Sequence, residues 1–321
     1  MLINGSMACL SLQRTVIMDF NRWNLFWSVC FGSTACIIIF GNSLSISVFV
    51  KRRLRRRSYY LLIDLAVADL LVGLVAIPIY MMTVISEEAL VSRLVLDCVD
   101  MFTGFSSIFT LAFISLERVH AIARPLRHRQ LSSRSYAVAI IAPWILALAV
   151  TSTRVLLGFS VMENQHFVVV IIISLSSPLL IYCASYAVIW RKHASRPWGV
   201  RAAKGEARLS KTLFLITGAF VLTWLPFQML VIVLNICVPC KKVPFVTVFG
   251  IKLLQFANSF INIVIYSLRM QSYRHALYQI LARCKCSLAR RQELYPLTDI
   301  PTSIKLVSFS STLQLHRTSI P

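Results

Sequence analysis

Seven long apolar stretches, separated by short polar connections, constrain the fold of this 321-residue chain more than any other feature. Each is long enough to cross the roughly 30 Å hydrocarbon core of a bilayer as a helix. Hydrophobic residues make up 57% of the chain and charged residues only 14%, outside the usual composition of soluble domains. The sequence therefore predicts an all-α membrane protein, a seven-transmembrane helix bundle. The predicted spans are residues 25–50, 58–83, 93–119, 135–155, 166–190, 209–236 and 245–268.

The basic residues predict how the bundle is oriented. The net charge is +21, but the basic residues lie in clusters between apolar runs rather than in one patch, so we expect no nucleic-acid partner. Residues 51–57 carry six positive charges in seven positions, and the connections at 124–134 and 191–208 are also basic, whereas 86–92 is acidic. Because basic connections stay in the cytoplasm, the N-terminus is predicted outside the cell and the C-terminus inside.

The segments outside the spans have separate predicted roles. Residues 1–24 form an extracellular N-terminus, which contains a glycosylation sequon at Asn4 and no cleavable signal peptide. The seven-transmembrane bundle occupies residues 25–268. Residues 269–283 are amphipathic and are predicted to form a short helix on the inner membrane surface, in contact with lipids. Residues 284–321 form a cytoplasmic tail.

Two pairs among the nine cysteines suggest specific chemistry. Cys237 and Cys240 lie in a predicted extracellular connection and are candidates for a disulfide. Cys284 and Cys286 follow the predicted surface helix, where palmitoylation would add a second membrane anchor. Two free cytosolic thiols are the alternative for the second pair.

Polar residues recur inside the apolar spans, and their order and spacing form a pattern. Across residues 25–283 this pattern resembles that of rhodopsin-like (class A) G-protein-coupled receptors. The resemblance implies a plasma-membrane receptor that binds an extracellular ligand, activates a heterotrimeric G protein and engages arrestin. The residues that carry it are Asn42, Asp69, Glu117, Arg118, Trp144, Pro178, Tyr186, the run 223–226 (TWLP), Asn262 and Tyr266.

The same resemblance implies a cytoplasmic switch. Glu117, Arg118 and Glu206 match an ion-pair lock whose release frees the sixth span to move outward. The resemblance also assigns Tyr186, Tyr266 and Asn262 to the switch, and Pro178, Ile108 and Phe220 to a contact that transmits ligand binding towards it.

A sodium pocket is a further implication. The matching residues offer one carboxylate and neutral oxygen ligands, which a hard cation prefers. They are Asp69, Ser107, Asn258, Ser259 and Asn262. The alternative is a hydrogen-bonded carboxylate with water and no ion. A second acid, Asp64, is predicted to accept a hydrogen bond from the Trp144 indole.

The chain departs from the family pattern in two places. Arg93 stands where most members have a cysteine, and the loop at 156–166 has none, so the usual bridge to this loop is absent. The seventh-span motif lacks its proline, which predicts a straighter helix. Melanocortin receptors share the missing bridge and carry an acid where Asp97 stands. Arg93 and Ile79 replace their other two acids, so their calcium site is not expected here.

The ligand is predicted from Asp100, eighteen residues before Arg118, where amine receptors place the carboxylate that binds an ammonium group. The resemblance places the rest of the predicted ligand site in the same pocket: Asp97, Ser174, Trp224, Phe227, Lys252 and Phe256. Lys252 faces Asp100 by family geometry, so an internal ion pair is the alternative to a bound cation. An amine, a peptide with a basic residue and a zwitterion all remain open, as does an orphan receptor with constitutive activity.

Other classes of membrane protein fit less well. The six histidines lie in or near loops, with no acid and nucleophile grouped around them, so an enzyme is not expected. Lys252 lies one turn from the position of the lysine in animal opsins, which argues against a retinal protein. A transporter would show paired repeats and broken helices.

Overall fold

The computed structural model describes most of the chain, and its regular elements are all helical. The described residues are 3–51, 58–85, 90–194, 215, 218–233, 243–271, 273–280 and 282. Among them no strand occurs, which confirms the predicted all-α class. The chain divides into two compact units, Met1–Arg274 and His275–Pro321.

The helices of the first unit match the predicted spans. They are α1 (Ile3–Lys51), α2 (Ser58–Leu71), the π-helix η1 (Val72–Ala76), α3 (Ile77–Ile85), α4 (Leu90–Ala123), α5 (Pro125–Arg129), α6 (Ser133–Gly158), α7 (Asn164–Ala194), the Gly218–Val233 helix and α9 (Phe245–Arg269). In the part of the chain that the structure describes, six spans are long and apolar enough to cross a membrane. The Gly218–Val233 helix covers the described part of the remaining predicted span, 209–236.

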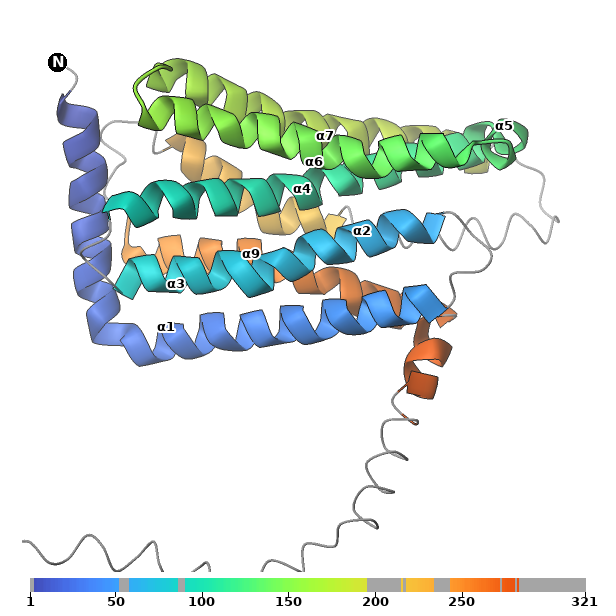
Figure 1. Cartoon of the computed structure of the whole chain (residues 1–321), viewed down its shortest axis with the longest axis horizontal. Helices are drawn as coiled ribbons and strands as arrows, with labels where there is room; N and C mark the ends of the chain where they lie inside the picture. The colour runs from blue at the N-terminus through green and yellow to red at the C-terminus, as the bar shows by residue number, and fades with distance from the viewer. Residues whose placement is uncertain are drawn as a thin grey trace, which may run out of the picture. The chain divides into compact units, whose positions relative to one another are not determined.

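Helix α1 begins earlier than its predicted membrane span. Its helical backbone starts at Ile3, whereas the candidate membrane-spanning part begins at Leu25. Figure 1 shows a bend that separates the early part of the helix from this span. The backbone at Asn4 is therefore helical.

A π-helix joins α2 to α3 within the second span (Figure 1). The Ile77 N–H donates to the carbonyl of Val72, five residues earlier. Pro78 follows directly, and a proline has no N–H to donate and its ring crowds the preceding turn. The wider turn next to the proline accommodates both effects. A side chain at Gly73 would lie 2.9 Å from Ile38 Cγ2, so this glycine lets the π-helix approach α1 closely.

Helix α4 occupies the centre of the unit, in contact with α2, α3, α5, α6 and α7. An aromatic core lies to one side of it, between α1, the second span and α9. Its fully buried rings are Phe31, Phe249 and Phe256, and the ring centroids of Phe31 and Phe249 lie 5.8 Å apart. The outer faces of the helices carry exposed apolar side chains such as Leu180 and Leu222, as lipid contact requires.

The buried carboxylate of Asp64 on α2 accepts hydrogen bonds from two other helices. Trp144 Nε1 on α6 donates to Asp64 Oδ1 on α2 over 2.9 Å, which confirms the predicted contact. Thr110 Oγ1 on α4 donates to the other oxygen, Asp64 Oδ2, over 3.3 Å. Asp64 thus satisfies one donor from each of two neighbouring helices, as buried polar groups require.

We predict that Asp64→Ala destabilises the fold by about 1–3 kcal/mol, because it leaves the partly buried indole N–H of Trp144 without its acceptor. Asp64→Asn should lose much less, because its amide oxygen can still accept from the indole. Thermal unfolding of the detergent-solubilised protein measures both. Equal loss in the two variants would contradict a role for this hydrogen bond.

Candidate functional site

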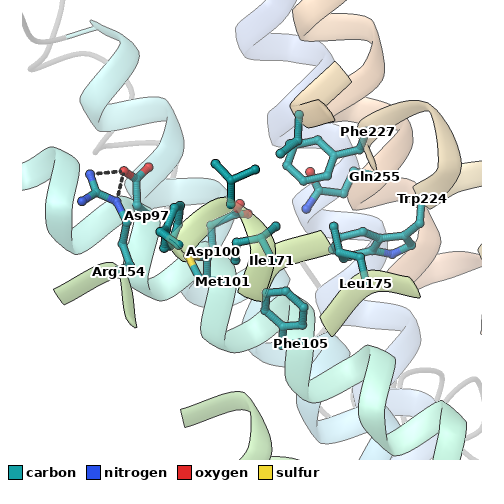
Figure 2. Close-up of a pocket in the computed structure, with 13 residues that line it drawn as sticks. Asp97, Asp100, Met101, Phe105, Arg154, Ile171, Leu175, Trp224, Phe227 and Gln255 are labelled. Carbon is teal, nitrogen blue, oxygen red and sulfur yellow. Dashed lines mark hydrogen bonds and ion pairs between the residues drawn. The ribbon is translucent and has the colours of Figure 1, made fainter. Parts of the chain in front are cut away.

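A cavity of about 240 Å³ opens at one end of the helix bundle. Figure 2 shows Asp97 and Arg154 at one end of the site, Trp224 and Phe227 toward the other, and Asp100, Met101 and Ile171 between them. The lining comes from α4, α6, α7, the Gly218–Val233 helix and α9. The lining residues are Asp97, Asp100, Met101, Phe105, Arg154, Phe167, Val168, Ile171, Leu175, Trp224, Phe227, Val231 and Gln255.

Asp100 forms an ion pair with Lys252, the internal contact that the sequence left open. Lys252 Nζ lies 2.5 Å from Asp100 Oδ2 and donates a second hydrogen bond to Gln255 Oε1 over 3.0 Å. The ammonium group also lies 4.9 Å from the ring centroids of Phe227 and Phe256. Lys252 is buried and is not among the residues that line the cavity. Lys252 therefore compensates the charge of Asp100 without lining the cavity itself.

A second ion pair joins Asp97 to Arg154 at the acidic end of the cavity (Figure 2). Arg154 Nε and Nη2 donate to the same oxygen, Asp97 Oδ2, over 3.0 and 2.8 Å. This pair is more open than the first, because the side chains of Asp97 and Arg154 are 44% and 22% exposed. Sequence reasoning missed Arg154. The available signal was a charged residue near the end of an apolar span, where it needs a partner.

The opposite end of the cavity is aromatic. The rings of Trp224 and Phe227 meet edge to face, with centroids 5.7 Å apart. A side chain at Gly104 would lie 3.0 Å from the Trp224 ring, so this glycine allows α4 to approach the indole. The Trp224 indole N–H is buried and has no hydrogen-bond partner among the described residues. This end of the cavity suits an apolar group.

The predicted ligand residues separate into three groups. Asp97, Asp100, Trp224 and Phe227 line the cavity. Lys252 and Phe256 lie behind Asp100, and Phe256 lines a separate cavity of about 10 Å³. Ser174 is buried on α7 and lines neither of these cavities, although its neighbours Ile171 and Leu175 line the larger one.

The residues predicted to bind sodium gather around Asp69, which is fully buried. Ser107 Oγ donates to Asp69 Oδ1 over 2.8 Å, and Asn262 Nδ2 donates to Oδ2 over 2.9 Å. Ser107, Asn258 and Ser259 all line the small cavity. Among the described residues no basic side chain pairs with Asp69. A buried carboxylate with neutral oxygen neighbours and no basic partner fits a sodium ion, which would supply the missing positive charge.

Two of the predicted transmission residues, Ile108 and Phe220, contact a residue that the sequence did not reveal, Tyr182. Pro178, Ile108 and Phe220 are all buried. Tyr182, one turn after Pro178 on α7, donates its hydroxyl to the carbonyl of Ile108 on α4 over 2.8 Å. Its ring meets Phe220 edge to face, with centroids 5.3 Å apart. Tyr182 therefore connects α7 with α4 and with the Gly218–Val233 helix.

Two of the predicted switch residues, Glu117 and Arg118, lie towards the other end of α4, about 30 Å from Asp97 by helical rise. Arg118 Nε and Nη2 donate to Glu117 Oε2. Two residues that sequence reasoning missed also hold Glu117: His128 Nε2 lies 2.8 Å from Oε1, and the Tyr136 hydroxyl donates to the same oxygen over 3.4 Å. The acid is therefore anchored to α5 and α6 as well as to Arg118.

Several predicted residues cannot be placed in this geometry. Glu206, Cys237, Cys240, Cys284 and Cys286 lie outside the described residues. Asn4 and Tyr186 lie in helices, but their side chains are outside the described part. Tyr266 is buried on α9, and its hydroxyl has no hydrogen-bond partner among the described residues.

Comparison with known proteins identifies the family. A family model described as "7 transmembrane receptor (rhodopsin family)" matches residues 41–266, well over half of the chain. The chain therefore belongs to the rhodopsin-like (class A) receptors, and the predicted family is confirmed.

Two relatives show how distant the similarity is. The adenosine receptor A2a of Equus caballus is 26% identical over 300 residues, which cover 81% of this chain and 72% of that receptor. The octopamine receptor beta-2R of Chilo suppressalis is 24% identical over 338 residues, which cover 85% of each protein. These relatives are receptors and not enzymes, in agreement with the sequence prediction.

We predict that sodium stabilises the folded protein, because an ion bound at Asp69 favours the native state. The thermal unfolding midpoint should rise when NaCl replaces N-methyl-D-glucamine chloride at constant ionic strength. A concentration ten times the dissociation constant contributes about 1.4 kcal/mol. Asp69→Asn should abolish this rise, whereas Asp64→Asn, a change of the same kind outside the site, should keep it. A full sodium effect in Asp69→Asn would remove the basis for the site.

Proposed function

We propose that this protein is a G-protein-coupled receptor of the plasma membrane that binds a small extracellular ligand with a cationic group. The observation that carries the proposal is the cavity in which Asp97 and Asp100 lie one helical turn apart. They face Trp224 and Phe227, which we call the aromatic wall. Carboxylates in a partly dry site form strong charge-assisted hydrogen bonds with ammonium groups. Aromatic faces such as that of Phe227 add attraction for a cation.

Both carboxylates keep an oxygen for a ligand. The hydrogen bonds that they accept from described residues end on Oδ2 of Asp97 and Oδ2 of Asp100. Each Oδ1 therefore accepts no hydrogen bond from the described part of the chain. A ligand ammonium can bind there without first separating Asp100 from Lys252.

The volume of the cavity favours a small molecule. At about 240 Å³ it lies below the roughly 300–1,000 Å³ typical of sites for drug-sized ligands. A melanocortin-like peptide is the second candidate, which the acid at Asp97 favours. Such a peptide would insert one basic side chain and leave the rest of its chain outside the cavity.

The opposite end of the bundle supports coupling to a heterotrimeric G protein. Arg118 lies at the end of α4, beside a short helix with exposed basic residues, Arg127 and Arg129. The positive connections favour a cytoplasmic location for this end, which gives an extracellular N-terminus and a cytoplasmic C-terminus. Arrestin would bind at the same end. In this orientation Asn4 would be glycosylated outside the cell, Cys237 and Cys240 would form an extracellular disulfide, and Cys284 and Cys286 would be palmitoylated on the cytoplasmic side.

A regulatory sodium ion also belongs to this proposal. It would be held by Asp69, Ser107 and the α9 residues Asn258, Ser259 and Asn262. The ion would neutralise the Asp69 carboxylate while the helices are in their resting arrangement. Because a ligand of one state shifts the population towards that state, sodium would favour the inactive receptor.

We predict that a cationic agonist depends on Asp100. Small amines and short peptides should be tested by cAMP and calcium responses in transfected cells. Asp100→Asn should lower the potency of an active cationic agonist about ten- to a hundredfold, because it removes a hydrogen bond between charged groups. The control is Glu163→Gln, an exposed acid outside the cavity. Unchanged potency in Asp100→Asn at equal surface expression would contradict a cation-binding role.

We predict that Glu117→Gln raises signalling without ligand, because a neutral amide holds Arg118 less tightly in the resting state. A loss of about 1 kcal/mol corresponds to about a fivefold change in the equilibrium. The measurement is basal cAMP or calcium at matched surface expression. Arg118→Ala provides the comparison and should lose coupling while it still reaches the surface. Unchanged or lower basal signalling in Glu117→Gln would count against the lock.

A further inference from the structure

The ion pair between Asp97 and Arg154 leaves one hydrogen-bond acceptor and one hydrogen-bond donor available to a ligand. Arg154 directs Nε and Nη2 to one oxygen of Asp97, instead of pairing two nitrogens with two oxygens. Asp97 Oδ1 and Arg154 Nη1 therefore have no hydrogen-bond partner among the described residues. Both side chains line the cavity and are partly exposed. A guanidinium group can bind a carboxylate through two parallel hydrogen bonds. Nη1 and the second hydrogen of Nη2 leave Arg154 able to bind a ligand carboxylate in this way.

Lys252 cannot serve as the anion-binding group of the same cavity. Its ammonium group already contacts Asp100 and Gln255, and three aromatic rings surround it, including Tyr80 at 5.6 Å. It does not line the cavity. Arg154 is thus the basic residue that the described lining offers to a ligand.

The charges around the cavity favour a ligand with no net charge. Asp97 and Asp100 supply two negative charges, and Arg154 and Lys252 supply two positive charges. A simple cation would bring an uncompensated charge into a poorly solvated site, which is costly. A zwitterion brings one charge of each sign and leaves the site neutral.

We propose that Arg154 forms a carboxylate subsite and that the ligand is a free amino acid with an aromatic or large aliphatic side chain. The proposal rests on the proposed function and adds an anion to the cationic group. The ligand ammonium binds Oδ1 of Asp97 and of Asp100, and its carboxylate binds Arg154.

The geometry restricts which zwitterions fit. Arg154 Nη2 lies only 2.8 Å from Asp97, so the two charges of the ligand must be close together, as in an α-amino acid. The remaining volume is lined by Met101, Phe105, Leu175 and the aromatic wall. An apolar side chain that enters this end is removed from water, which contributes to affinity.

The test compares amino acids with the amines that lack only the carboxylate. The pairs are L-phenylalanine with phenethylamine, L-tryptophan with tryptamine, and L-leucine with 3-methylbutylamine. Binding to the purified full-length receptor is measured through the rise in its thermal unfolding midpoint with ligand concentration. At least one amino acid should bind the wild type about tenfold or more tightly than its amine.

Variants assign this difference to Arg154. Arg154→Gln should remove the advantage of the amino acid over its amine. The amine should bind this variant at least as tightly as the wild type, because the two aspartates then lack one compensating positive charge. Arg154→Lys keeps the charge and the partner of Asp97 but loses the fork, so it should give an intermediate affinity even if Arg154→Gln folds poorly. Arg134→Gln, an exposed arginine at the other end of α6, should bind as the wild type does.

The outcomes separate this inference from the proposed function. If amines bind as tightly as amino acids, or if Arg154→Gln and Arg154→Lys weaken both ligands alike, the carboxylate subsite is wrong while a cationic ligand stands. If no amino acid in the set binds but an amine does, the inference is again wrong. If neither kind of ligand binds, or if Asp100→Asn binds both as the wild type does, the cation site itself is wrong.

Discussion

The cost of placing charge in a membrane controls the interior of this receptor. An ionised side chain at the centre of a bilayer costs roughly 2.5–3.5 kcal/mol on insertion scales, so each one needs a partner. Asp100 has Lys252, Asp97 has Arg154, and Asp64 accepts hydrogen bonds from Trp144 and Thr110. These contacts all cross between helices, so they determine how the helices are rotated against one another. Apolar packing alone restricts this rotation less, because hydrophobic surfaces carry no directional requirement.

Asp69 and Asp64 differ from the other intramembrane acids because their described partners are neutral. Ser107 and Asn262 donate to Asp69, but neither removes its charge. Ser107 also lines the small cavity together with Asn258 and Ser259, so further side-chain oxygens are grouped there. One of the two donors to Asp64 is the indole N–H of Trp144, which cannot coordinate a cation. This difference is the reason to propose a sodium ion at Asp69 and not at Asp64, five residues earlier on the same helix.

The seven spans could be predicted from the sequence, because hydropathy carries that information within each span. The contact between Asp64 and Trp144 could be predicted because Trp144 belongs to the family pattern and a buried indole N–H needs an acceptor. The pairing of Asp97 with Arg154 could not, since Arg154 is not part of that pattern and the contact depends on the rotation of α4 against α6. The turn at Val72–Ala76 was also missed. Pro78 signals a local break in the helix, but the sequence does not show whether a kink or a π-helix resolves it.

The contacts of α4 explain how a small ligand can affect a distant switch. Along this helix Asp100 pairs with α9, Ser107 with Asp69 of α2, and the carbonyl of Ile108 with Tyr182 of α7. Glu117 then meets α5 and α6. A helix that is held at each of these levels cannot rotate at one level without straining the others. A ligand at the proposed site, Asp97 and Asp100, would therefore act on α4 as a whole, because the internal ion pairs and hydrogen bonds hold this helix in register.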